Sequence, residues 1–443
     1  MKRTNVVLAF LTLSFSLALI FGLEGTPTVS YEEGNLSNNL SISSFKDTHL
    51  LEWNFTWGGN YHENVLAMTT DSLGDIYITG LTKFTSPADW DIYLVKFNST
   101  GHLQWNQTWG GNELERFYEI AFDSFNNIYL GGSIEYRGPP KSRFLLVKFN
   151  SLGLYQWNQT WGGSNYDIGH GMAVDSADNI YLMGSTTINS DLRLVKFNSL
   201  GQYQWNRTWG GNYFDSGHDI VIDTSDNIYI TGSYGSTDGA DVFLIKYNNM
   251  GHFQWNRTYN SNNVQYKVAI ALDSLSNIYI GTWVMNISTL DSVMLFLKYD
   301  QTGDLLWDRI WGKKGKYTIV DIALDSYNNI YAVGGFNNSV EKGWDFSLIQ
   351  FDTSGVQQFN QTWGGPNRDF YSAIAIDLTD NIYLAGMNDG SNIYLEKYSR
   401  DIITQKGQPS DETIPFENIF TTFIVFSVVI LIIVDLKSKK LIK

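Results

Sequence analysis

The sequence contains no cysteine. This excludes disulfide bonds, cysteine nucleophiles and thiolate metal sites together, so burial and closure alone must stabilise the fold. Charged residues are also scarce, at 17%, and the formal net charge is −15. A nucleic-acid-binding protein needs a basic face, so this composition excludes nucleic acid as a partner.

Recognisable catalytic motifs are absent as well. The chain has no G-x-S-x-G elbow and no H-E-x-x-H, and GKKGKYT, beginning at Gly312, is not a complete P-loop. We therefore predict no catalytic, cofactor-binding or metal-ligating residues. The six histidines are scattered, but His170 and His218 share one position of the repeat described below, so a metal held by this pair is the alternative.

What the sequence does contain is an internal repeat. The segment WNQTWGG occurs at residues 105–111 and again at 157–163, and five variants bring the number of copies to seven. The second aromatic residue falls every 48 to 52 residues, at positions 57, 109, 161, 209, 259, 311 and 363. Self-similarity at this period is typical of a repeat architecture.

A second motif, D-[ST]-x-x-[ND]-I-Y and close variants, keeps the same step and begins at Asp71, Asp123, Asp175, Asp223, Asp273, Asp325 and Asp377. With a third, apolar run that ends in Lys-aromatic, each unit holds four short strands, which we name a, b, c and d. We expect the aspartates to form a–b turns; calcium binding is the sharper alternative, although EF-hand spacing is missing. The sequence thus predicts an all-β, seven-bladed propeller of four-stranded blades over residues 49–405.

Two small-residue positions support this fold. Alanine often stands two residues before the repeated aspartate, which suits an innermost strand crowded around an axis. Six glycines three residues after the tyrosine predict a bulge or a close backbone approach, and Thr282 breaks that pattern.

The aromatic residues of strand d are expected to pack between blades, with ligand stacking as the alternative. Because a d-type strand at residues 50–57 precedes the first a strand and the last unit stops at strand c, the N-terminal strand should complete the seventh blade.

The two ends of the chain predict export and a membrane anchor. Lys2 and Arg3 precede an apolar run at residues 6–23, so residues 1–25 are interpreted as a signal peptide, or else as an uncleaved anchor. Residues 26–48 form an exposed leader and 406–415 a polar stalk. The apolar segment 416–436 is long enough to cross a bilayer as a helix, and the lysines in 437–443 place that tail in the cytoplasm. We expect a single-pass plasma-membrane protein whose repeats are extracellular.

Sequons recur in strand d, at Asn54, Asn106, Asn158, Asn206, Asn256 and Asn360. In an exported protein they are candidate N-glycosylation sites. The equally weighted alternative is that Asn and Thr are polar edge-strand residues copied by duplication.

The repeat resembles the SBBP-type β-propeller repeat, as GGSNYDIGHGMAVDSADNIYLMGS from Gly162 illustrates. This resemblance spans about 350 residues and implies the propeller fold, but little about activity, because such repeats occur in large exported microbial proteins with few assigned functions. The c–d hairpin is also similar to the tryptophan-docking repeat of quinoprotein-like propellers, as in Asn98, Gly101 and Trp105. That resemblance implies packing between blades; the quinone, calcium carboxylates and vicinal disulfide of that family have no counterpart here.

The b–c connections differ in length, charge and aromatic content, whereas the a–b turns are nearly identical. Loops displayed on a rigid scaffold commonly bind partners, although simple drift is the alternative. We predict Trp90, Tyr136, Arg137 and Trp344 as anchors, because aromatic residues and Arg dominate interface energetics. The predicted function is a non-catalytic binding module for a carbohydrate, a peptide or an envelope protein. An exported enzyme acting on glycans or a quinone-linked substrate is the alternative.

Overall fold

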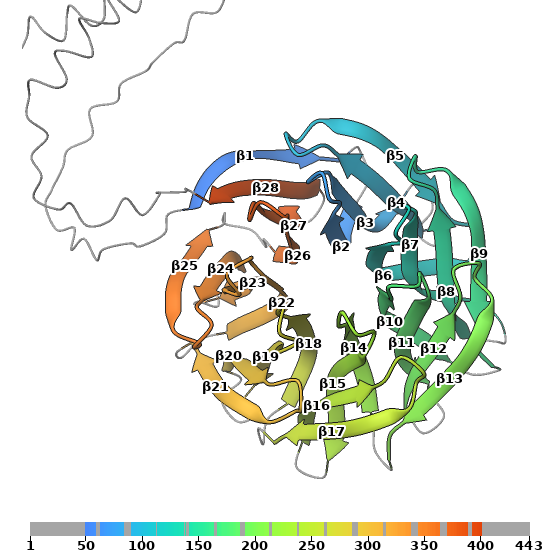
Figure 1. The fold of residues 1–443 in the computed structure, drawn as a ribbon. Helices are drawn as coiled ribbons and strands as arrows, with labels where there is room; N and C mark the ends of the chain where they lie inside the picture. Colours follow the sequence, from blue (N-terminus) through green and yellow to red (C-terminus); the bar gives the residue numbers. More distant parts are fainter. Residues whose placement is uncertain are drawn as a thin grey trace, which may run out of the picture. The chain divides into compact units, whose positions relative to one another are not determined.

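The computed structural model describes residues 49–58, 63–83, 90–111, 113–136, 138, 141–163, 166–186, 191–211, 215–236, 239–260, 264–285, 291–312, 316–337, 344–363, 370–388 and 392–400. These residues form seven four-stranded antiparallel sheets around a common axis (Figure 1). The predicted signal peptide (1–25), leader (26–48), stalk (406–415), transmembrane segment (416–436) and tail (437–443) lie outside them. Within the described ranges, none of the elements is a helix that is both long and apolar enough to cross a membrane.

The strands follow the predicted order a, b, c and d. Blade 1 contains β2 (Glu63–Thr70), β3 (Ile76–Lys83), β4 (Trp90–Phe97) and β5 (Leu103–Trp109). Blade 2 contains β6 (Leu114–Phe122), β7 (Ile128–Glu135), β8 (Ser142–Phe149) and β9 (Tyr155–Trp161). Blade 3 contains β10 (Asp167–Val174), β11 (Ile180–Thr186), β12 (Leu192–Phe197) and β13 (Tyr203–Trp209). Blade 4 contains β14 (Asp215–Ile222), β15 (Ile228–Ser236), β16 (Gly239–Tyr247) and β17 (Phe253–Tyr259).

Blade 5 contains β18 (Val264–Leu272), β19 (Ile278–Met285), β20 (Ser292–Tyr299) and β21 (Leu305–Trp311). Blade 6 contains β22 (Lys316–Leu324), β23 (Ile330–Asn337), β24 (Asp345–Phe351) and β25 (Gln357–Trp363). Blade 7 contains β26 (Phe370–Ile376), β27 (Ile382–Asn388) and β28 (Asn392–Arg400), and its outermost strand is β1 (His49–Trp57).

Strand β1 closes the ring as the sequence predicts. It pairs antiparallel with β28, from His49 opposite Arg400 to Trp57 opposite Ile393, so one sheet joins the two ends of the propeller. Figure 1 shows β1 lying beside β28 at the junction with blade 1. Without β1, β28 would be an unpaired sheet edge.

The hydrophobic core consists of seven clusters, one between each pair of neighbouring blades. At the interface of blades 1 and 2, for example, Trp105 and Trp109 pack against a buried cluster that includes Tyr77 and Phe117. The other six clusters take their strand-d aromatic residues from β9, β13, β17, β21, β25 and β1. The repeated aromatic residues are therefore packing residues, and seven interfaces require seven copies.

The same tryptophans explain the glycine of the c–d turn. Gly153 has a φ of +77°, and a Cβ atom added to it would lie 2.9 Å from the Trp105 ring of the preceding blade. An added Cβ atom would lie similarly close to the ring of Trp157 at Gly201, and to the ring of Trp205 at Gly251. Each tryptophan therefore docks on the next blade, as the resemblance to quinoprotein-like repeats implies.

The repeated aspartate stabilises the a–b turn. The backbone N–H groups of Phe125 and Asn127 donate to Asp123 Oδ1 at 3.0 and 2.8 Å, and Tyr129 Oη donates to Oδ2 at 3.2 Å. The tyrosine-to-aspartate bond recurs in all seven blades. This geometry supports the structural interpretation of these aspartates rather than the calcium interpretation.

Antiparallel strand order gives the ring two unlike faces. We call the end with the a–b and c–d turns the turn face, and the end with the b–c and d–a connections the loop face. A bridge between Ser142, at the start of a c strand, and Tyr166, in a d–a connection, confirms that these two kinds of connection meet. Several b–c connections are shorter than predicted, because strand b continues; β19, for instance, pairs with β20 as far as Met285.

Candidate binding site in the central channel

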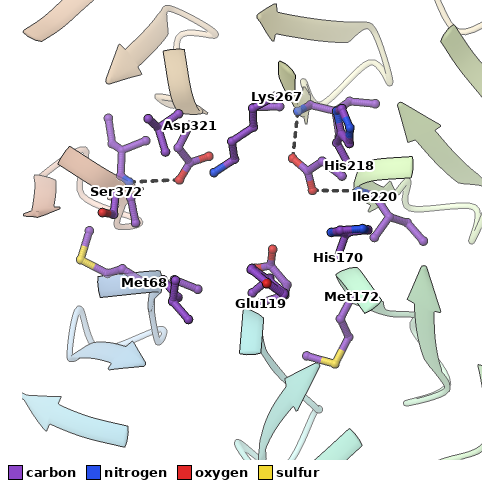
Figure 2. Close-up of a pocket in the computed structure, with 18 of the residues that line it drawn as sticks. Met68, Glu119, His170, Met172, His218, Ile220, Lys267, Asp321 and Ser372 are labelled. Atoms are coloured by element: carbon purple, nitrogen blue, oxygen red, sulfur yellow. Dashed lines mark hydrogen bonds between the residues drawn. The ribbon is translucent and has the colours of Figure 1, made fainter. Parts of the chain in front are cut away.

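The seven innermost strands surround a cavity of about 590 Å³ on the axis of the ring. It is lined by residues of β2, β6, β10, β14, β18, β22 and β26, the a strands of the seven blades (Figure 2). Cavities of this size with a few converging polar groups are typical of small-ligand sites.

A bulge in each a strand aims side chains into this cavity. In blade 2 the register shifts between Phe117 and Glu119, so Tyr118 is the extra residue. Opposite the bulge, a Cβ atom on Gly132 would lie 1.9 Å from the carbonyl oxygen of Arg116. Only glycine fits such an approach, and equivalent contacts at Gly80, Gly184, Gly232 and Gly334 confirm the predicted role of this position.

Blade 5 has no glycine opposite its bulge, and its bulge is wider than those of the other blades. Thr282 replaces the glycine, and the register shift widens to the interval between Gln265 and Val268. The Thr282 hydroxyl donates to the carbonyl oxygen of Lys267 at 2.5 Å. The wider bulge makes room for the threonine side chain and brings Lys267 to the channel wall.

Three carboxylates project into the channel from alternate blades, Glu119 of blade 2, Asp219 of blade 4 and Asp321 of blade 6. They occupy the same repeat position, four residues before the repeated aspartate, where the other blades have only Ala or Gly. Three residues before the repeated aspartate, by contrast, every blade has Met or Ile. The three acids are therefore exceptions at a position that is otherwise small.

Two of these carboxylates connect neighbouring blades. Asp219 accepts hydrogen bonds from the N–H of Ile220 in its own strand, at 2.7 Å, and from the N–H of Ile270 in blade 5, at 3.0 Å. Asp321 likewise accepts from Ile322 at 2.9 Å and from Ile374 of blade 7 at 3.1 Å. They satisfy N–H groups on the exposed edge of the innermost strands.

Glu119 makes a weaker local contact. The N–H of Ile120 donates to Glu119 Oε1 at 3.3 Å. Figure 2 shows Glu119 on one side of the channel, while the Lys267 side chain extends from the other side toward Asp321. Glu119 is therefore the channel carboxylate that is placed away from the lysine.

Burial raises the pKa of all three carboxyl groups. Burial and the charge of Asp321 raise the pKa of Asp219 to about 7, against the hydrogen bond from Ile270. The pKa of Glu119 is held well above its usual range by burial and by the charges of Asp219 and Asp321. Burial also raises the pKa of Asp321, although the Lys267 ammonium opposes that rise. The three carboxyl groups are therefore harder to ionise than free carboxyl groups, and a cation that entered the channel would favour their ionised form.

The two histidines at the shared repeat position do face the channel together. Their ring centroids are 6.5 Å apart and the rings are nearly perpendicular, at 78°. Burial lowers the pKa of His170 to about 4 and that of His218 to about 3, so both imidazoles are neutral at physiological pH. Across the described residues, no group of three or more acidic or histidine side chains has a metal-binding arrangement. The pair thus offers neutral hydrogen-bonding groups to the channel.

The three predicted anchors that lie among the described residues, Trp90, Tyr136 and Trp344, are on the loop face but on different blades. Trp90 is the first residue of β4, opposite Lys83, rather than a loop residue, because the b and c strands extend further than expected. Tyr136 follows β7, half-buried, and its N–H donates to the carbonyl oxygen of Lys141 at 2.8 Å. Trp344 is half-buried immediately before β24, and Arg137 lies outside the described residues.

The sequon asparagines lie on the outer strands, each next in sequence to a half-buried aromatic residue and therefore on the opposite face of the strand. Asn54, Asn106, Asn158, Asn256 and Asn360 are exposed, whereas Asn206 is half-buried. Asn158 and Asn206 donate side-chain hydrogen bonds to Tyr155 Oη and Tyr203 Oη, at 2.8 and 2.7 Å. Glycosylation of these positions stays a prediction.

The sequence motifs do not predict the channel residues Glu119, Asp219, Lys267 and Asp321. They belong to no motif, and their convergence depends on the ring. A usable signal was nevertheless present, because aligning the seven units exposes one position where acids replace Ala or Gly in alternate blades.

Comparison with known proteins agrees with this architecture. Residues 156–190 match the family model of the SBBP repeat, a β-propeller repeat. Among curated proteins, none has a sequence that matches this chain.

Solved structures resemble the fold at very low sequence identity. The hydrazine synthase of Kuenenia stuttgartiensis matches with a TM-score of 0.53 and 7% identity, over 74% of this chain and 94% of that one. The Dos1 propeller matches with a TM-score of 0.47 and 10% identity, over 79% and 95% of the two chains. The β-propeller domain of the trilobed protease from Pyrococcus furiosus matches with a TM-score of 0.47 and 9% identity, over 76% and 93%. At these identities the likeness concerns the fold alone.

Proposed function

We propose that this chain, which carries the SBBP β-propeller repeat at residues 156–190, is a membrane-tethered extracellular module that binds a polar ligand without catalysis. The ligand would be a carbohydrate, a peptide or an envelope protein that contacts the loop face and inserts a polar or cationic group into the channel. The membrane tether is the apolar segment 416–436.

One observation carries this proposal: four charged residues that are not part of the repeat converge on one cavity. Glu119, Asp219, Asp321 and Lys267 reach the channel from four different blades, whereas the repeated residues stabilise turns and interfaces. Selection for the fold alone does not require three acids at a position that Ala and Gly fill elsewhere. A ligand that carries an ammonium or guanidinium group fits the side of Glu119, which is placed away from Lys267.

Binding without chemistry is favoured by how the carboxylates are used. Both oxygens of Asp219 and both oxygens of Asp321 already accept backbone N–H bonds, and these bonds connect neighbouring blades. A general acid or base would have to exchange protons from such positions, which would weaken those bonds in each cycle.

A ligand screen on the full chain in nanodiscs tests the proposal. Glycan and peptide arrays select a ligand, and Glu119→Gln is then compared with Asp304→Asn, a matched change in a c–d turn of the turn face. We expect Glu119→Gln to weaken binding of a cationic ligand about tenfold, corresponding to about 1.4 kcal/mol, and Asp304→Asn to leave it unchanged. Equal affinity of both variants with the parent would contradict a channel site.

The predicted topology has its own test. Protease treatment of intact cells should remove the repeats and spare a tag placed after residue 443. Protection of the repeats together with digestion of the tag would reverse the orientation.

A second candidate, an exported enzyme acting on glycans or a quinone-linked substrate, is favoured by one specific observation. Glycoside hydrolysis requires two carboxyl groups in one cavity, of which the general acid has a raised pKa, and burial raises the pKa values of Glu119 and Asp219. Turnover of a ligand selected on the arrays, abolished by Asp219→Asn, would support this alternative over simple binding.

A further inference from the structure

The turn face carries a set of exposed apolar side chains. In the a–b turns, a large apolar residue stands next to the repeated aspartate or one residue further on, at Leu73, Phe125, Leu275, Tyr327 and Leu378, and these side chains are 64 to 80% exposed. The aspartate fixes each turn through the backbone, so the tip side chain is not constrained by turn geometry.

The c–d turns add Leu152, Leu200 and Met250, which are 65 to 69% exposed. Together, every one of the seven blades places at least one large apolar side chain at a turn tip. Single exposed apolar residues are common on soluble proteins, but their collection at one end of a ring marks an interaction surface.

Direct hydrogen bonds make this surface rigid. The Ser124 N–H and hydroxyl both donate to the Asp178 carboxylate of the next blade, each at 2.8 Å. The same pair of bonds links Ser176 to Asp226 and Ser326 to Asp380. At these three blade junctions the neighbouring turns are thus held in fixed positions relative to one another, as a docking surface requires.

Both connections to the remaining chain are at this same face. His49 begins β1 opposite Arg400, which ends β28. Tyr398 lies opposite Ile382, the first residue after the a–b turn of blade 7, so both strand ends are at the turn face. The chain that leads to the apolar segments 6–23 and 416–436 therefore joins the propeller where the apolar tips are exposed.

We propose that the turn face rests on the surface of a lipid bilayer, with the apolar turn tips inserted among the headgroups. This inference rests on the proposed membrane tether. The 15 residues 401–415 would allow separations up to roughly 50 Å when extended, so the tether permits contact but does not enforce it. Apolar tips that ring a rigid face make contact favourable, as they do in proteins that lie on a membrane interface. The loop face and its channel mouth then point away from the membrane.

The absence of cysteine allows a direct test with single-cysteine variants of the full chain. Leu275→Cys and Leu378→Cys place a bimane label at the turn face. Gly163→Cys is the matched control at the loop face, where an added Cβ atom has nothing within 4 Å. Each variant is assembled into nanodiscs of phosphatidylcholine, because the acidic turn residues disfavour anionic lipid. One set of nanodiscs contains lipid with a nitroxide near the headgroup, and a second set lacks it.

The proposal predicts strong nitroxide quenching of the labels at positions 275 and 378 and none at position 163. Quenching at position 163 equal to that at 275 and 378 would overturn the proposal. Dimerisation of the chain through the turn face, with the labels at 275 and 378 shielded from the nitroxide, would overturn it as well. Co-migration with nanodiscs is measured on the same samples. A chain that fails to co-migrate refutes the tether, and the surface proposal with it; one that co-migrates without quenching refutes the lipid-facing surface alone.

Discussion

Asp123 illustrates how one repeated residue stabilises a blade. It accepts hydrogen bonds from two backbone N–H groups, from Tyr129 and from the Lys148 ammonium. Although burial opposes ionisation, the bonds from Asn127 and Lys148 hold the pKa of Asp123 below its usual range. This contribution to stability is therefore present above the unfolded-state pKa and is lost only as the pH falls through the folded pKa.

The pKa of Glu115 is shifted in the opposite direction to that of Asp123, upwards. Glu115 is 3% exposed, its Oε2 has no partner among the described residues, and burial together with the charge of Asp91 raises its pKa from 4.5 to about 7. A raised carboxyl pKa stabilises the fold below the unfolded value, and that stabilisation is lost as the pH rises through the folded value.

We therefore predict that Glu115→Gln stabilises the protein at pH 8 and that its advantage vanishes below about pH 4.5. The gain should be on the order of 1 kcal/mol, because solvent near the loop face screens part of the burial penalty. Denaturant unfolding at both pH values measures it, with Glu135→Gln at a half-exposed position as the control. A gain that is the same at both pH values would show that packing, not ionisation, is responsible.

At the scale of single elements, β1 has a special role. It supplies the strand that blade 7 lacks, and Trp53, Phe55 and Trp57 also pack into the cluster between blades 7 and 1. The strand thus contributes both a hydrogen-bonded edge and part of a hydrophobic interface.

Deleting residues 50–57 should leave β28 as an open edge, lower the melting temperature and promote aggregation. Calorimetry and light scattering measure this, and deletion of residues 31–44 serves as the control, which we expect to be neutral. Melting at the parent temperature by a monomeric 50–57 deletion would mean that the ring does not depend on β1.

The elements differ in how far the sequence predicts them. The counterparts of Trp105 pack between blades and the counterparts of Asp123 stabilise the a–b turn in each unit. Repetition alone therefore predicts the blades, their interfaces and the closure of the ring. Glu119 belongs to a candidate site only together with Asp219 and Asp321, which are about 100 and 200 residues away in the sequence. The three residues come together only when the ring forms, so local sequence does not predict the site. Lys267 reaches the channel through a wide bulge, a register change that no local motif specifies.

At the scale of the whole molecule, the two faces of the ring have different compositions. The turn face is built from repeated turns with apolar tips, whereas the loop face carries the variable connections around the channel. A propeller oriented with its turn face on the membrane would present the loops to the surroundings.

Replacing the segments FTSPADW (84–90) and VEKGW (340–344) with short Gly-Asn turns should abolish ligand capture and leave the melting temperature nearly unchanged. Surface loops contribute little to stability when the hairpins beneath them remain paired. Binding of the array-selected ligand and thermal unfolding are measured on the same preparations. Capture that survives both replacements would place the binding surface elsewhere on the ring.

The most direct test of the account is an experimental structure of the full chain in nanodiscs with the array-selected ligand bound. We predict ligand density in the channel, in contact with Glu119 and entered from the loop face, with the turn face against the lipid. Ligand density confined to the turn face or to the outer strands, with an empty channel, would contradict the central claim.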